Sequence, residues 1–99
     1  MMTTLDILKA ARERLVKDGW AQGHFTNVDG EHCMLGAVME VVPVDADGYS
    51  EADHYTHARY ELGKAVGTQN LLEWNDYPGR QVDEVLVAFD KAIATLEAA

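Results

Sequence analysis

Cysteine, proline and long apolar runs are scarce in this sequence, which contains one Cys and two Pro. The single cysteine, Cys33, excludes an internal disulfide and is typical of a reducing compartment. The longest apolar stretch, residues 33–44, is interrupted by Gly36, Glu40 and Pro43, and it is too short to span a membrane. No basic segment followed by an apolar one opens the chain. We therefore expect a cytoplasmic protein without a membrane-spanning helix.

Basic residues are also few, because eight Lys and Arg stand against seventeen Asp and Glu, giving a net charge of −9. Residues 1–18 hold four basic and three acidic residues, whereas residues 19–99 hold four basic and fourteen acidic ones. So acidic a chain is repelled by phosphate backbones and by anionic lipids, which argues against direct nucleic-acid or membrane-surface binding. A protein partner attracted by charge would be basic, such as a surface that normally binds DNA.

Apolar residues recur mostly at helical spacing, which predicts an all-α fold. We expect one compact domain of four to five helices over residues 1–99, built around the almost entirely apolar segment that begins at Cys33. Two capping signatures, Thr3-x-x-Asp6 and Ser50-x-x-Asp53, mark helix starts. The predicted helices cover residues 4–18, 33–42, 50–67, 68–74 and 82–96.

The polar segment between the first two helices is harder to assign. Asp29-Gly30 favours a hairpin turn, and Phe25 and Val28 have side chains suited to a short strand. The two alternatives for residues 24–33 are a minor two-stranded ribbon and a plain loop.

Cys33 and His32 are the candidate catalytic residues. A cysteine at a helix N-terminus can have a lowered pKa, and His32, His54 and His57 are candidate bases. However, the chain continues from Cys33 into an apolar helix, and no cysteine-hydrolase signature flanks it. This pattern favours a buried structural cysteine.

The sequence indicates neither a metal site nor a cofactor. His54 and His57, three residues apart on one helix, suit a zinc ion, but a structural zinc site needs four ligands and no Cys-x-x-Cys motif accompanies them. Asp45, Asp47 and Gly48 resemble part of a calcium loop, but the remaining ligand positions do not match its register. We interpret this segment as a turn. No glycine-rich phosphate-binding loop is present.

Residues 74–80 combine aromatic, amide, carboxylate, Pro-Gly and guanidinium groups directly before the last helix. Trp74, Asn75, Asp76 and Arg80 are the candidate binding residues, with Trp as a platform and the polar groups as hydrogen-bond partners. A structural role is the favoured alternative. In that role Trp74 is largely buried against the last helix, and Asn75 or Asp76 accepts backbone N–H bonds within residues 76–82.

Residues 19–23, 33–37, 74–80 and 84–93 resemble segments of a family of small actinobacterial and actinobacteriophage proteins that is classed as a domain of unknown function. The resemblance implies a mainly helical fold and a phage or actinobacterial setting, and it implies no activity. Gln81 departs from the pattern, because Thr or Ser commonly stands there to cap the last helix. The segments that carry the resemblance are Gly19-Trp20-Ala21-Gln22-Gly23, Cys33-Met34-Leu35-Gly36-Ala37, Trp74-Asn75-Asp76-Tyr77-Pro78-Gly79-Arg80 and the helix from Glu84 to Ile93.

Together these observations favour a small acidic accessory protein that is not an enzyme and acts by binding a basic surface of a host protein. Two alternatives remain open. One is a thiol-dependent enzyme centred on Cys33, with Asn75 or Asp76 orienting a histidine base. The other is a self-associating structural module.

Overall fold

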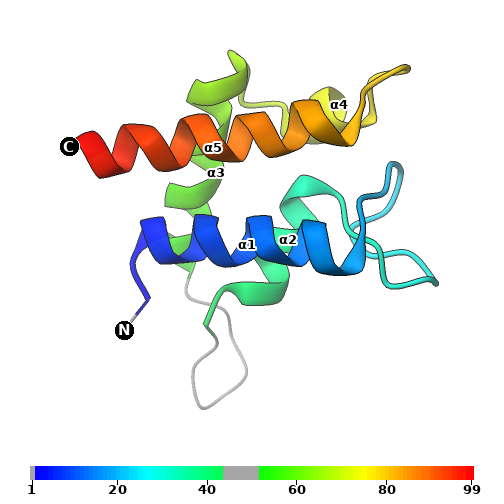
Figure 1. The fold of residues 1–99 in the computed structure, drawn as a ribbon, viewed down its shortest axis with the longest axis horizontal. Coiled ribbons are helices and arrows are strands. Elements are labelled where there is room, and N and C mark those ends of the chain that lie inside the picture. Colours follow the sequence, from blue (N-terminus) through cyan, green and yellow to red (C-terminus); the bar gives the residue numbers. More distant parts are fainter. Residues whose placement is uncertain (1, 44–51) are drawn as a thin grey trace.

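The computed structural model describes residues 2–43 and 52–99, and these residues form an all-α fold, as the sequence predicts (Figure 1). None of its helices is both long enough and apolar enough to cross a membrane, within the residues described. The helices are α1 (Thr4–Asp18), α2 (Met34–Val41), α3 (Ala52–Val66), α4 (Leu71–Asp76) and α5 (Val82–Ala98).

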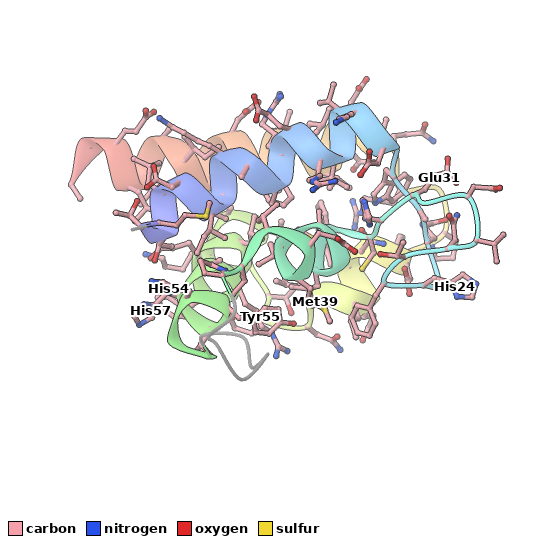
Figure 2. All side chains as sticks on the ribbon, turned by 90° about the horizontal axis from the view of Figure 1, so that it is seen from below. His24, Glu31, Met39, His54, Tyr55 and His57 are labelled. Atoms are coloured by element: carbon pink, nitrogen blue, oxygen red, sulfur yellow. The ribbon has the colours of Figure 1, made fainter. Side chains whose placement is uncertain are left out.

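The helices pack in two layers. Helices α1 and α5 lie side by side and antiparallel in one layer, and α3 crosses behind both of them (Figure 1). Helix α2 packs against α1, and α4 contacts α2 and α3. Seen from below, α1 and α5 form one side of the molecule, while α2, α3 and α4 form the other (Figure 2).

The core lies between these layers, and α2 is its centre. Met34, Leu35, Ala37 and Val38 of α2 are almost completely buried, as expected for a helix that is apolar nearly all round. The other helices each contribute one apolar face. Their fully buried side chains include Ile7, Leu8, Ala58, Leu62, Leu71, Val85 and Phe89.

Local capping sets most of the helix ends. Thr3 and Asp6 form the predicted capping box at the start of α1, and Gly19 ends that helix with a positive φ of 99°. At the start of α5, the Gln81 side-chain Nε2 donates to the Gly79 carbonyl (3.3 Å). The Glu84 carboxylate accepts the Gln81 backbone N–H (2.9 Å). The predicted cap at Ser50 and the turn at residues 45–48 lie outside the described residues.

Residues 20–33 form an ordered loop with two isolated bridges and no strand. His32 makes a parallel bridge with Trp20 and an antiparallel one with Thr26. Each pairing is an isolated bridge, so neither extends into a ribbon. Of the two alternatives that the sequence left open, the loop is the one that forms.

Candidate functional site

Three segments that the sequence singled out, residues 19–23, 33–37 and 74–80, meet at one junction. At its centre is Asn75, whose side chain is completely buried. Helix α4 carries it there because Asn75 lies one turn after the buried Leu71, on the same helix face.

The Asn75 side chain joins the three segments through its hydrogen bonds. Its Oδ1 accepts from the Trp20 indole N–H (2.7 Å) and from the Met34 backbone N–H at the start of α2 (3.1 Å). Its Nδ2 donates to the Ala21 carbonyl (3.1 Å) and to Asp76 Oδ1 (2.9 Å). An amide side chain is needed here, because the site requires both an acceptor and a donor.

The neighbouring loop completes the end of α4. Gln22 Nε2 donates to the carbonyls of Asn75 and Tyr77, at 3.0 Å each. The Gly23 N–H donates to Asp76 Oδ1 (3.0 Å). The last carbonyls of a helix lack hydrogen-bond donors within the helix, and here the Gln22 side chain supplies the donor.

The prediction that Asn75 or Asp76 accepts backbone N–H bonds within residues 76–82, as in an Asx turn, is therefore wrong. Both residues belong to α4, and the backbone N–H groups that they accept come from Gly23 and Met34 rather than from residues 76–82. Helix continuation frees these side chains from the local turn and directs them to distant segments.

Trp74, which the sequence predicts to be largely buried against α5, packs at the edge of the hydrophobic core, and its contact with α5 stays a prediction. Trp74 is only partly buried, because Asn75 occupies the inward position and Trp74 is rotated about 100° from it around the helix. The Arg80 guanidinium covers the Trp74 ring at 3.9 Å from its centre, and its Nε donates to the Trp74 carbonyl (2.9 Å). Arg80 also pairs with Glu84 at 2.8 Å. These contacts tie α4 to the start of α5.

Cys33 caps α2 from a buried position. Its Sγ accepts the Gly36 N–H at 3.3 Å, and the residue is 2% exposed. Burial raises the pKa of the Cys33 thiol, so the thiolate that nucleophilic chemistry needs is disfavoured. These features are those of a structural cysteine.

His32 is equally enclosed. Its Nε2 lies 2.9 Å from Asp18 Oδ2, and its Nδ1 lies 2.8 Å from Thr26 Oγ1. Both ring nitrogens are thus occupied, and neither points to the Cys33 thiol as a general base would. The hydrogen bond from His32 is the main cause that lowers the pKa of Asp18.

The remaining histidines do not join this cluster. His24 lies on the loop, whereas His54 and His57 lie on α3 at the opposite end of the molecule (Figure 2). No group of three or more His, Cys, Asp or Glu residues is placed to hold a metal ion in the part of the chain that the structure describes.

Beside the junction, the surface has an open hollow of about 420 Å³, here called the loop groove. Phe25 and Leu72 are its large apolar side chains, and they are 47% and 41% exposed. Asp76 adds a carboxylate to its wall, so one of the four candidate binding residues lines this groove. The groove is lined by Gly23, His24, Phe25, Thr26, Cys33, Leu72 and Asp76.

The loop that carries Phe25 is held firmly although its apolar side chains face solvent. Asn27 Oδ1 accepts the N–H groups of Asp29 (3.0 Å) and Glu31 (2.9 Å), and the Asn27 N–H donates to the Glu31 carbonyl (2.9 Å). Val28 at the tip is fully exposed. The sequence contained a signal for this site, because Phe25 and Val28 are apolar residues in a polar loop. Apolar side chains of such a loop remain exposed when the loop forms no strand that packs against the core.

Comparison with known proteins adds a family assignment. No curated protein and no solved structure matches the chain. A family model described as "Family of unknown function (DUF6197)" matches residues 1–95. Because this match covers nearly the whole sequence, the chain belongs to the family of unknown function DUF6197.

Proposed function

We propose that this protein is a small accessory protein that binds another protein through the loop groove. The observation that carries the proposal is the pair of exposed apolar side chains, Phe25 and Leu72, on a frame fixed by hydrogen bonds. A rigid surface loses little conformational entropy when a partner binds, and half-exposed apolar side chains gain from being covered.

Charge defines the kind of partner. The groove contains the Asp76 carboxylate, and the loop beside it carries Asp29 and Glu31. With a net charge of −9, the chain attracts a basic protein surface and repels nucleic acid and anionic membranes. The partner in this proposal is a basic host protein that presents an apolar side chain to Phe25 and Leu72.

The chemistry of the groove supports recognition over catalysis. Cys33 lines the groove, but burial raises its pKa and its sulfur accepts a backbone hydrogen bond. His32 is enclosed between two other side chains. A thiol-dependent enzyme would need a cysteine with a lowered pKa and a histidine free to act as its base. The proposal includes the cytoplasm of an actinobacterium as the setting, with the protein encoded by the bacterium or by its phage, and the resemblance of the sequence motifs supports this setting.

Site-specific photo-crosslinking tests the proposal. A photoreactive phenylalanine analogue replaces Phe25 in one sample and Tyr60 in the control, because Tyr60 is similarly exposed (53%) but lies on α3. In an actinobacterial lysate, position 25 should give an adduct with one basic protein, and position 60 should not. High salt should weaken the adduct, because screening reduces attraction between exposed charges.

The matched variant is Leu72→Glu, which places a charge in the groove without altering the buried junction. It should remove the adduct from position 25 while circular dichroism shows an unchanged helical fold. Equal adducts from positions 25 and 60, or an adduct that Leu72→Glu leaves intact, would contradict the proposal.

A further inference from the structure

A second apolar hollow, of about 410 Å³, lies between the end of α1 and the start of α5. Its most exposed apolar side chain is Val16, at 63%, and Val82 is 37% exposed. This part of the surface, here called the α1/α5 face, is separate from the loop groove. The hollow is lined by Leu15, Val16, Gly19, Trp20, Val82 and Leu86.

The two helices of this face are held in fixed register. They run antiparallel (Figure 1), and they are joined by the ion pairs Arg12–Asp90 (2.7 Å) and Lys9–Glu97 (3.2 Å). The Arg12–Asp90 pair lies near the middle of both helices, and the Lys9–Glu97 pair lies toward the end opposite to the apolar hollow.

Charge divides the face lengthwise. Helix α1 carries four basic and three acidic residues, whereas α5 carries four acidic residues and one basic residue. The remainder of the sequence is strongly acidic. A second copy of a chain with net charge −9 is therefore repelled by most of the surface. On α1, Lys9, Arg12 and Arg14 already form ion pairs within the chain, so Lys17 is the basic residue of this helix that can attract a second copy.

We propose that the α1/α5 face binds a second copy of this chain in a two-fold symmetric dimer. The two-fold axis runs along the helices, so α1 of each copy lies over α5 of the other. The end of α1 that carries Lys17 then meets the acidic first turn of α5 on both sides, and the two apolar hollows meet at the same end. An axis across the helices would instead place α1 on α1 and α5 on α5, with like charges opposed.

This arrangement places two residues of opposite charge against each other across the interface. Lys17 adjoins Val16, and Asp83 adjoins Val82, so both lie at the apolar end of the face. Both are exposed, and neither forms an ion pair within residues 2–43 and 52–99. In the dimer, Lys17 of each copy faces Asp83 of the other, and symmetry makes two such pairs.

Sedimentation velocity on the purified protein tests the dimer. From micromolar to millimolar concentration, the wild-type protein should shift from the monomer mass to twice that mass. Val16→Glu should weaken the association by about tenfold or more, because it places a charge in the apolar hollow. Val28→Glu is the matched control, since Val28 is fully exposed at the loop tip, and it should associate like the wild type.

A charge exchange tests the orientation. Lys17→Glu and Asp83→Lys should each weaken the dimer, because each opposes like charges across the interface. The double variant should restore it, and thermal unfolding would show that all three proteins remain folded. A protein that stays monomeric at every concentration, or a double variant weaker than either single one, would overturn the proposal.

Discussion

Asn75 occupies a helix position where an apolar residue would ordinarily enter the core, one turn after Leu71. Its amide oxygen instead accepts the Trp20 indole N–H and the Met34 backbone N–H, which belong to two other segments. A buried polar side chain with complete hydrogen bonding fixes one arrangement of the segments around it, because any displacement leaves unpaired groups in a dry environment.

Replacing this residue should therefore be costly. Asn75→Ala leaves the Trp20 indole N–H and the Met34 N–H without their acceptor, and each buried unpaired group costs about 1–3 kcal/mol. We expect a loss of about 3–5 kcal/mol in the free energy of unfolding, measured by urea denaturation. The control is Asn70→Ala at the exposed N-cap of α4, which should cost about 1 kcal/mol. Similar losses for the two variants would show that the buried network contributes little.

Asp18 and His32 give the protein an acid-sensitive contact. The hydrogen bond from His32 lowers the pKa of Asp18, so the folded state binds this proton less readily than the unfolded state. The stabilisation is present above the ordinary carboxyl pKa, about 4, and is lost as pH falls through the lower folded value. Asp18→Asn should lower the urea midpoint at neutral pH and flatten its decline below about pH 4. Parallel curves for variant and wild type would contradict this assignment.

At this scale, the sequence predicted residues whose partners are local and missed those whose partners are distant. Thr3 and Asp6 lie three residues apart, and their capping box follows from spacing alone. Asn75 bonds to residues more than forty positions away. Its local alternative, an Asx turn, was equally consistent with the sequence, and tertiary packing decides between them.

At the scale of elements, the periodicity of apolar residues and the residues that begin or end helices predicted most of the helices. Helix α1 has the predicted bounds because a capping box begins it and Gly19 ends it. Helix α4 runs farther than predicted, through Asp76, because Gln22 binds carbonyls at its end and stabilises the additional residues. That partner lies more than fifty residues away in sequence, so no local pattern could reveal it.

Helix α2 depends on a glycine at a close crossing. The Phe25 carbonyl accepts the Cys33 N–H at 3.1 Å and lies directly over Gly36, where an added Cβ would overlap it. Ala ordinarily stabilises a helix relative to Gly by about 1 kcal/mol, but here the backbone must move. Gly36→Ala should therefore lower the free energy of unfolding by about 1–3 kcal/mol, measured in urea.

Gly63 in α3 is the matched control. Its added Cβ would meet the end of the Gln69 side chain, which is exposed and can rotate away at the cost of one hydrogen bond to the Tyr60 carbonyl. Gly63→Ala should leave stability within about 1 kcal/mol of the wild type. If both alanine variants were equally stable, the close crossing at Gly36 would not constrain the fold.

At the scale of the whole molecule, composition and periodicity predicted the all-α class, because both can be read from the linear sequence without knowledge of the tertiary packing. The two surface hollows are properties of its packing. The loop groove combines residues 23–26 with Leu72 and Asp76, and the other hollow combines the end of α1 with the start of α5. Apolar side chains at these positions were visible in the sequence, but which of them stay exposed depends on how the layers meet.

The two proposed contacts use different layers, so they should be separable. The loop groove lies where α4 meets the loop before α2, while the dimer face lies on α1 and α5 (Figure 2). Mutations at sites without shared contacts have nearly additive effects. Val16→Glu should weaken the dimer and preserve the crosslink from position 25, whereas Leu72→Glu should remove the crosslink and preserve the dimer. Sedimentation and crosslinking on the same protein samples measure both effects. Loss of the dimer in Leu72→Glu would mean that the second copy of the chain itself occupies the loop groove, and the partner of that groove would then be this protein.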